Sequence, residues 1–388
     1  MPVTKRELLY LSPVVPALTG NGLAMRAGMA LEALASRYSV SLLIVELYPS
    51  LDQNAGKYFD RICRRWTAVE LTPSPPRRFW RRRQSFSEVL FEYKKLHFEV
   101  IHVFRLAMLP FAEPFLQAFP NARRHLDLDD IDSATHDRIA ELADSNGDHD
   151  LASREREAAD RSRLMEQQAC SRFHRVYVCS QSDEDRLSKL QSGTDIEILP
   201  NAVRMSERPL RSGSRVMSLL FAGTLGYYPN EDAAVYLCRE VVSRLRQRTG
   251  RSVEVKIVGS GASLRLRQAA AEAGADVPGF VGAIRDSYER ASMVVVPLRA
   301  AGGTRIKILE AWSYGRPVVA SSIGIEGLAA RNGEHALIAD DADSFADCCL
   351  RLMQDADLCK RLIGNGQSLV AELYSPDSLR RTIAALDD

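Results

Sequence analysis

The stretch from 297 to 321, PLRAAGGTRIKILEAWSYGRPVVAS, constrains the fold more than any other part of the chain. An apolar run ends at its start, and Gly302-Gly303 then turns the chain. Apolar residues recur at helical spacing as far as Gly315, and Val318–Ala320 begins a second apolar run. A strand, a Gly-rich turn, a helix and a strand in this order form a unit of a parallel sheet, since the helix carries the chain back beside the first strand.

The charges at the start of this helix predict a phosphate site. We expect Thr304 to cap the helix, which places Arg305 and Lys307 in its first turn, where cations are disfavoured. Two cations, helix N–H groups and a glycine pair that admits an anion favour phosphate binding. Glu310 shares a face with Lys307 and lies roughly 9 Å along the axis from Thr304, a position that suits ribose hydroxyls. The alternative is a solvated Lys307–Glu310 ion pair beside a plain turn, which leaves the charge placement unexplained.

Composition is that of a globular protein with more than one core. The chain has 388 residues, 46% hydrophobic and 26% charged, and a net charge of +1, so we expect two or three domains and no nucleic-acid partner. Its seven cysteines form no CxxC pair, which predicts reduced thiols in the cytoplasm and no zinc site. No apolar run reaches membrane-spanning length and the N-terminus lacks the pattern of a signal peptide.

A second parallel-sheet unit opens the chain. A strand at 7–11 and a helix at 23–37 flank the turn PALTGNG. Gly20 and Gly22 are followed by Met25 where the dinucleotide fingerprint G-x-G-x-x-G requires glycine, which makes an oxidoreductase unlikely. The turn is either a plain tight turn or a place where the backbone approaches a ligand.

Carboxylates and a histidine follow two later strands of the first half. His102 lies in the apolar strand Val100–Phe104, where the simpler interpretation is a core residue, and Arg105 follows it. The segment 124–132, RHLDLDDID, alternates apolar and polar residues and ends in an acidic turn. Such a cluster also resembles a metal-binding DxD motif, but it lies far in sequence from the predicted phosphate helix.

The segment 73–83, PSPPRRFWRRR, is the largest local shift in composition. It is either a solvated basic loop or a membrane-surface patch, in which arginines attract anionic lipid and the aromatic rings lie at headgroup depth. Nucleic-acid contact is the third interpretation, and it is disfavoured because the rest of the chain carries no matching basic field. The residues of this patch are Arg77, Arg78, Phe79, Trp80, Arg81, Arg82 and Arg83.

Several segments together resemble the GT-B glycosyltransferases of family 4. The sequence from Gly302 to Ala311 is similar to a subgroup that reads GGTR-x-K-x-LEA. Many other members carry two glutamates here: the second matches Glu310, and Gly302 stands in place of the first. The segments PNAV at 200–203, VGSG at 258–261 and PGFVG at 278–282 are similar to further family motifs.

The resemblance implies an α/β fold of two Rossmann-like parallel-sheet domains that face each other across a cleft. It implies an N-terminal acceptor-side domain at 1–204, a nucleotide-sugar-binding domain at 205–373, and a C-terminal helix at 374–388 that packs back on the N-terminal domain. It implies catalytic roles for Arg305, Lys307 and Asp127. Donor-binding residues would be Gly223, Thr224, Gly259, Phe280, Val281, Gly302, Gly303, Thr304 and Glu310. Acceptor or cleft residues would be Gly20, Asn21, Gly22, His102, Arg105, Asp129 and Asp130, with His125 as a weaker candidate.

By this resemblance the chain is a retaining, metal-independent transferase that uses a nucleoside-diphosphate sugar and no further cofactor. The acceptor would be a glycan, a lipid-linked sugar or a small molecule, and the location cytoplasmic or on the inner face of a membrane. A sugar-nucleotide 2-epimerase would use the same donor half and act without an acceptor. A non-catalytic nucleotide-sugar-binding subunit is also compatible with the missing first glutamate.

Overall fold

The structure is a computed structural model that describes residues 5–48, 55–69, 85–190, 193–206, 217–250 and 252–387. Its contacts divide the chain into two compact units. The first comprises Met1–Ile131, Asp160–Asn201 and Pro376–Asp388, and the second comprises Asp132–Ala159 and Ala202–Ser375. The basic patch at 77–83 lies outside the described residues.

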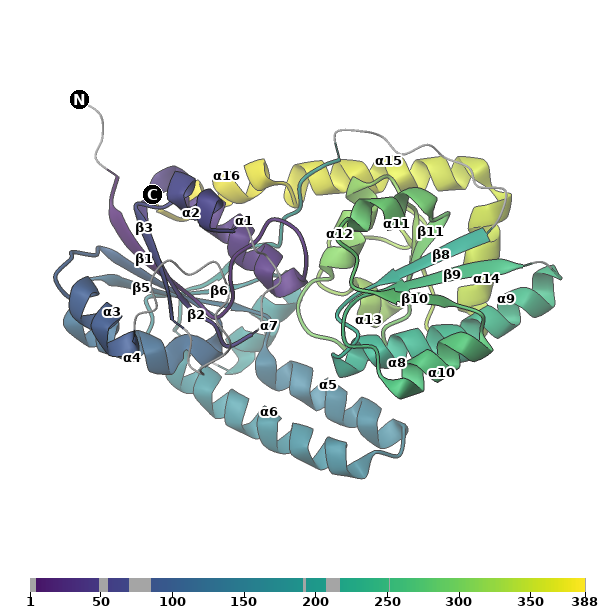
Figure 1. Ribbon diagram of the computed structural model, residues 1–388, viewed down its shortest axis with the longest axis horizontal. Helices are drawn as coiled ribbons and strands as arrows, with labels where there is room; N and C mark the ends of the chain where they lie inside the picture. The colour runs from purple at the N-terminus through teal and green to yellow at the C-terminus, as the bar shows by residue number, and fades with distance from the viewer. Residues whose placement is uncertain are drawn as a thin grey trace. The chain divides into compact units, whose positions relative to one another are not determined.

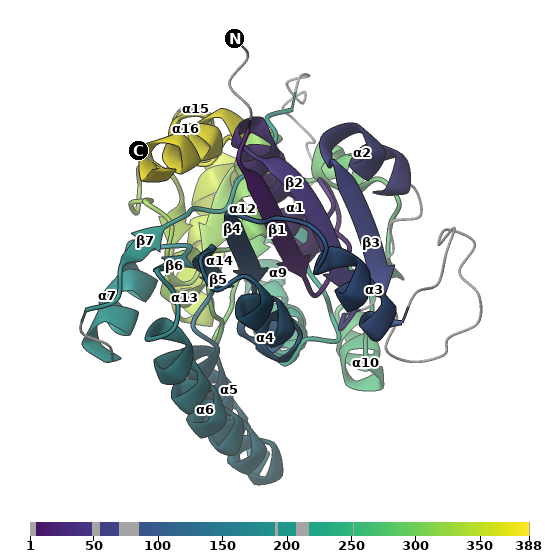
Figure 2. The ribbon, with the colours of Figure 1, turned by 90° about the vertical axis from the view of Figure 1, so that its left-hand side faces the viewer.

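The first unit is built on a seven-stranded parallel sheet in the order β3-β2-β1-β4-β5-β6-β7, which Figure 2 shows from right to left. Its central strands are almost continuously apolar because helices cover both faces. The strands are β1 (Glu7–Ser12), β2 (Ser39–Val45), β3 (Arg65–Val69), β4 (Val100–Phe104), β5 (Arg123–Asp129), β6 (Arg175–Val178) and β7 (Ile196–Ile198).

Helices α1 and α16 of this unit pack against each other. The last helix therefore joins the N-terminal sheet, as the sequence predicted. The helices of the first unit are α1 (Gly22–Arg37), α2 (Ala55–Ile62), α3 (Phe86–Tyr93), the short η1 (Leu106–Met108), α4 (Leu109–Ala118), α7 (Gln181–Leu190) and α16 (Pro376–Asp387).

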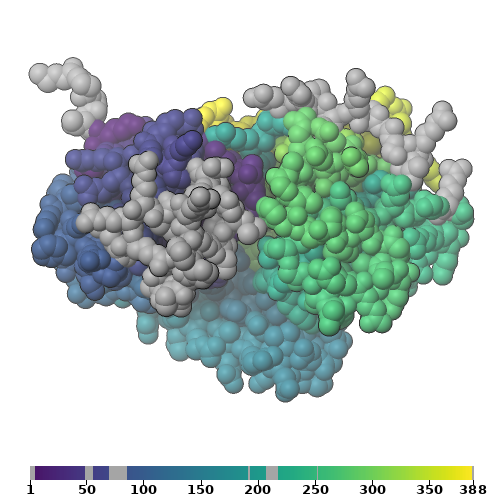
Figure 3. Space-filling view, in the orientation of Figure 1, coloured from purple at the N-terminus to yellow at the C-terminus, as the bar shows by residue number. Residues whose placement is uncertain are grey.

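The second unit is built on a six-stranded parallel sheet in the order β10-β9-β8-β11-β12-β13. Helices α8 to α10 cover one face, and α11, α12 and α15 cover the other (Figure 1). The outer sides of α8 and α10 contribute to the green surface in Figure 3. The strands are β8 (Met217–Ala222), β9 (Val253–Val258), β10 (Asp276–Gly279), β11 (Met293–Val296), β12 (Val318–Ala320) and β13 (Leu337–Ile338).

The helices of the second unit include α5, which the sequence analysis did not predict. The boundary between the units falls inside the long charged helix α6, after Ala159. The helices are α5 (Asp132–Ser145), α6 (His149–Cys170, shared), α8 (Tyr228–Tyr236), the π-turn η2 (Leu237–Val241), α9 (Val242–Thr249), α10 (Leu264–Glu272), α11 (Ile284–Arg290), α12 (Ile306–Ser313), α13 (Ser322–Ile325), α14 (Ala342–Gln354) and α15 (Ala356–Leu373).

Both sheets thus share the strand order of doubly wound folds. In such folds ligands bind beyond the carboxyl ends of the strands. The expected strands and the turns that follow them are confirmed, with differences of one or two residues at their ends. The seven cysteines are free thiols. Within the described ranges, no helix combines the length and the apolar character that crossing a bilayer requires.

Candidate functional site

The loops after β8, β9 and β10 are joined backbone to backbone at the carboxyl edge of the second sheet. The amide of Gly223 donates to the carbonyl of Val258 at 3.0 Å, and the amide of Gly259 donates to the carbonyl of Gly279 at 3.0 Å. A side chain at Gly259 would place its Cβ 1.6 Å from the Gly223 carbonyl oxygen. Glycine is therefore required here, and the two expected donor-binding glycines lie side by side.

Lys307 lies over the first of these loops. Its ammonium donates to Asn230 Oδ1 at 2.7 Å and lies 4.4 Å from the centre of the Phe221 ring. A Cβ on Gly223 would come within 2.8 Å of the Lys307 Nζ atom. Burial, assisted by the charge of Arg305, lowers the pKa of Lys307 to about 7, although Glu310 opposes this shift. The structure therefore places a cation directly above the glycine that begins this loop.

Glu310 lies one turn further along α12 and is held by a tyrosine from α11. The Tyr288 hydroxyl donates to Glu310 Oε2 at 3.3 Å, and its ring stacks on Tyr314 with centroids 4.8 Å apart. Burial raises the pKa of Glu310 to about 7, against the lowering effects of Tyr288 and Lys307. Within the described chain no ion pair joins Lys307 to Glu310, so the geometry does not support the solvated-pair alternative.

Arg305 is turned toward its own loop. It is the N-cap residue of α12, so the predicted cap at Thr304 was wrong by one position and only Lys307 of the two cations lies in the first turn. The Arg305 guanidinium donates to the carbonyls of Gly302 and Gly303, and to that of Ile323 at 3.2 Å. The side chain is buried. Its described contacts therefore stabilise the glycine turn.

The remaining predicted donor residues lie at the same edge of the sheet. Phe280 follows β10 and is 55% exposed, so its ring is not part of the core. Val281 comes next in the chain and is half-buried. Thr224 is exposed in the loop after β8, and its carbonyl accepts from Asn230 Nδ2 at 3.0 Å. These positions leave an aromatic ring and a hydroxyl residue accessible beside the glycine loops.

The carboxyl edge of the first sheet carries a buried charge network. Asp127, at the end of β5, has no exposed surface and accepts from Arg26 at 2.7 Å. Arg26, one turn into α1, donates to Asp127 and to the carbonyl of Leu199 at 2.5 Å. The Arg26–Asp127 pair is thus buried inside the unit, where Asp127 Oδ2 and Arg26 Nε have no hydrogen bond to the described residues.

Asp129 and Arg105 lie above this network in an uncommon backbone conformation. They are the two non-glycine residues with positive φ in the described chain, at 65° and 72°. Asp129 is 16% exposed, and its carboxylate lies 3.7 Å from Arg105 and 3.5 Å from Arg26. Burial raises the pKa of Asp129 to about 7, although both arginines oppose this. Arg105 also pairs with Asp130, so an arginine binds each of the candidates Asp127, Asp129 and Asp130.

The two histidines of this half belong to the core. His102 is 1% exposed and stacks on Tyr177, with ring centroids 5.6 Å apart, and His125 lies on the neighbouring strand. Burial lowers the pKa of His102 to about 3, assisted by the charge of Arg26. The core interpretation of His102 is therefore favoured over a ligand contact.

The turn at Gly20, Asn21 and Gly22 is exposed. The Asn21 side chain accepts from the amide of Ala24 at 2.8 Å and caps α1. Gly20 has φ 113°, which favours glycine. The contacts of this turn are those of a tight turn with a helix cap.

The sequence analysis did not identify two contacts of this site. Asn230, at the start of α8, accepts from Lys307, and Tyr288, in α11, donates to Glu310. Both partners are distant in the chain from α12. A residue-by-residue pattern carries no information on such pairings.

Residues 217–355 match the family model for glycosyl transferases group 1. A search of curated protein sequences gives no significant match. Among solved structures, sucrose-phosphate synthase from Thermosynechococcus elongatus has a TM-score of 0.74 and 16% identity, over 99% of this chain and 98% of that chain. TarM has a TM-score of 0.72 and 11% identity, over 99% of each chain.

HepE from Anabaena, solved with UDP and glucose, has a TM-score of 0.68 and 13% identity, over 98% of this chain and 99% of that chain. At these identities the likenesses concern the fold, and they confirm the predicted two-domain GT-B architecture. The match over the second unit and the fold of the whole chain together support a glycosyltransferase.

Proposed function

We propose that this protein is a retaining glycosyltransferase that moves a sugar from a nucleoside-diphosphate sugar to a glycan, lipid-linked or small-molecule acceptor. The donor binds to the carboxyl edge of the second unit and the acceptor to that of the first. The observation that carries the proposal is the Lys307 ammonium, held by Asn230 directly above Gly223 at the start of α12. A partly buried cation over a glycine, where nothing but backbone lies beneath it, suits a diphosphate.

Each donor group has a candidate partner in the second unit. Lys307 and the amides at the start of α12 bind the diphosphate, and they oppose the charge that grows on it as the glycosidic bond breaks. Glu310, oriented by Tyr288, accepts from the ribose hydroxyls. Phe280 and Val281 lie beside the base, while Gly223, Thr224 and Gly259 allow the nucleotide to approach the backbone. Arg305 acts indirectly, because its described contacts hold the glycine turn.

The carboxylates of the first unit divide into two roles. Asp127 has no exposed surface, so we assign it to positioning Arg26 rather than to substrate contact. Asp129, Asp130 and Arg105 lie at the strand ends and are partly exposed. We assign these three to acceptor hydroxyls. His102 stabilises the core beneath them.

Retention follows from attack on the same face of the sugar that the diphosphate leaves. The bond from the anomeric carbon to the phosphate oxygen breaks, the acceptor oxygen bonds to the same carbon, and the acceptor proton passes to the departing phosphate. A double displacement would require a carboxylate nucleophile beside the sugar. We assign no carboxylate to that role, since those of the first unit are engaged by arginines.

The printed ligands of two structural neighbours guide the choice of donor. HepE is solved with UDP and with UDP-glucose, and S. aureus TarM with UDP and α-GlcNAc-glycerol. We therefore propose a uridine nucleotide as the first donor to test, with a glycan or glycoside as acceptor. A role at the inner face of a membrane stays a prediction, since it depends on the patch at 77–83 outside the described residues.

A thermal-shift panel of UDP-, GDP- and dTDP-sugars, followed by product analysis, tests this function. Donor binding stabilises the folded state by mass action, so the correct nucleotide raises Tm and the others do not. We expect transfer to an acceptor with the anomeric configuration kept. An epimerised nucleotide sugar formed without acceptor would indicate the epimerase alternative. Donor binding with neither transfer nor hydrolysis would indicate a binding subunit, and no shift with any nucleotide would contradict the proposal.

A further inference from the structure

Guanidinium groups bind three consecutive carbonyl oxygens in the glycine turn of the second unit. Arg138 Nη1 donates to the carbonyl of Ala301 at 2.8 Å. Arg305 donates to the carbonyls of Gly302 and Gly303. The turn between β11 and α12 is thus held by two arginines, one from its own sequence and one from α5. The sequence analysis identified Arg305 and did not identify Arg138.

The orientation of these carbonyls fixes the direction of the amides that follow them. No described peptide is cis, and in a trans peptide the N–H points opposite to the C=O of the same plane. The amides of Gly302 and Gly303 are therefore turned away from the guanidinium that binds the preceding carbonyl. Within the described part of the chain, neither amide donates a hydrogen bond to protein. Two adjacent N–H groups oriented in this way can bind an anion.

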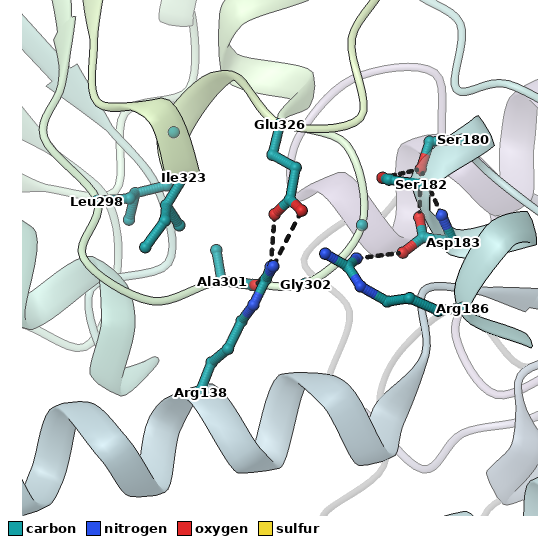
Figure 4. Close-up of polar contacts among 12 residues, drawn as sticks. Arg138, Ser180, Ser182, Asp183, Arg186, Leu298, Ala301, Gly302, Ile323 and Glu326 are labelled. Carbon is teal, nitrogen blue, oxygen red and sulfur yellow. Dashed lines mark hydrogen bonds and ion pairs between the residues drawn. The ribbon is translucent and has the colours of Figure 1, made fainter. Parts of the chain in front are cut away.

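Arg138 is itself held in place by a carboxylate. It forms a bidentate pair with Glu326, with distances of 2.6 and 2.9 Å, and Figure 4 shows the two side chains meeting beside Ala301. The Arg138 and Glu326 side chains are 24% and 26% exposed. A bidentate pair restricts both the position and the plane of the guanidinium. Arg138 is therefore pre-oriented toward the turn.

The second unit holds α5 in place at another point. Asn146, next to the end of α5, donates to the Tyr228 hydroxyl at 2.9 Å and to Asp232 Oδ1 at 2.9 Å. It also accepts from Arg299 at 3.0 Å. Loss of Arg138 therefore leaves this attachment intact, and its effect on the turn can be measured in a folded protein.

We infer that Arg138, oriented by Glu326, is a positioning residue that sets the glycine turn for the diphosphate of the donor. The inference rests on the proposed function and deepens it. Arg138 does not touch the donor in this account. It binds the Ala301 carbonyl, and so directs the Gly302 amide toward the phosphate oxygens.

The test compares a nucleoside diphosphate with its nucleoside. Calorimetry measures how tightly the wild type and Arg138→Ala bind UDP and uridine. If UDP does not bind, GDP and dTDP are each compared with their own nucleoside in the same way. We expect roughly tenfold weaker binding of the diphosphate and unchanged binding of the nucleoside, because one charge-assisted hydrogen bond to the turn is lost. Glu326→Gln should show the same selectivity with a smaller loss, since it keeps Arg138 but removes the ion pair.

Arg156→Ala is the matched control. Arg156 pairs with Asp144 in the same part of the second unit and does not contact the turn, so its affinities should equal those of the wild type. Equal weakening of diphosphate and nucleoside, or no weakening in either variant, would overturn the inference while leaving the function intact. A loss in Arg156→Ala equal to that in Arg138→Ala would also overturn it. A wild type that binds none of the diphosphates would overturn the proposed function together with the inference.

If Arg138→Ala does not fold, as judged by circular dichroism and Tm, then Glu326→Gln and Arg138→Lys are measured in its place. Lysine keeps one donor for the Ala301 carbonyl and loses the bidentate pair. Both variants should then show the selective loss of diphosphate binding. If both bind the diphosphate as tightly as the wild type, the positioning role is excluded.

Discussion

The two sheets have the same strand order, yet their carboxyl edges are chemically opposite. At the edge of the first sheet, three carboxylates meet two arginines. At the edge of the second, glycines bring backbones into contact and Lys307 lies above them. The first edge contains charged side chains that neutralise one another, and the second contains little besides amides and a cation.

The difference shows that the loops, and not the fold, set the chemistry of each unit. A network of three carboxylates and two arginines provides acceptors and donors for neutral hydroxyl groups and has no excess of positive charge to attract an anion. A glycine loop under a lysine provides a positive field with space for a large anion. This assignment of hydroxyl binding to the first edge and diphosphate binding to the second can be tested variant by variant.

The largest expected effect is on stability, at the first edge. Arg26→Ala leaves Asp127 as an unpaired charge with no exposed surface, which should cost about 3–5 kcal/mol of unfolding free energy. Urea unfolding followed by tryptophan fluorescence measures the loss. The double variant Arg26→Met/Asp127→Leu should recover much of it. A single variant as stable as the wild type would show that the network does not hold this edge together.

The next effect is on turnover, at the second edge. Lys307→Ala removes the cation that opposes charge on the departing diphosphate, and should lower kcat by about 10²–10³-fold, as for other lost transition-state donors. Initial rates of sugar transfer give kcat and KM. The control is Lys360→Ala, on the exposed side of α15, which should match the wild type. Unchanged kcat in Lys307→Ala would remove the lysine from the mechanism.

The pH dependence of diphosphate binding sharpens the same point. The pKa of Lys307 is about 7 without ligand, so the ammonium is charged below that pH and loses its proton above it. Because the diphosphate favours the charged form, affinity should be highest below pH 7 and fall by up to about tenfold per unit above it. Calorimetry gives the affinity for UDP at each pH in the wild type and in Lys307→Met. The ratio of the two affinities isolates the lysine, because the ligand's own titration is the same in both. A ratio that is flat from pH 6 to 9 would disagree with a lysine contact.

The smallest effect concerns the orientation of Glu310. Tyr288→Phe keeps the stack on Tyr314 and loses the hydroxyl that donates to Glu310, so KM for the donor should rise about three- to tenfold with little change in kcat. Discrimination between UDP and 2′-deoxy-UDP should shrink as well. Equal discrimination in wild type and variant would mean that Glu310 does not select the ribose.

Most of the fold could be predicted, because the apolar runs and Gly-rich turns are local. The strand Val100–Phe104 and the helix expected at 23–37 lie where the pattern placed them. The helix α5 was not predicted, since its sequence DSATHDRIAELADS has a weak apolar face and several residues that favour turns. Its contacts within the second unit could not be inferred from sequence, since they depend on tertiary packing.

The candidate site was predicted in part. The positions of Lys307 and Glu310 follow from helical spacing, whereas the pairing of Arg26 with Asp127 joins residues 101 positions apart. Arg305 was expected to project toward a ligand, because sequence shows charge but not the local carbonyls that compete for it. Spacing therefore predicted which loops form the site, and tertiary contacts decide what each side chain does there.

A crystal structure of the protein with UDP tests the central claim most directly. The account predicts a diphosphate with one oxygen within about 3 Å of the Lys307 ammonium, the distance of a charge-assisted hydrogen bond, and with the amides of Gly302 and Gly303 directed at it. A diphosphate bound among Arg26, Arg105 and Asp129 instead, with Lys307 still on Asn230 alone, would contradict it.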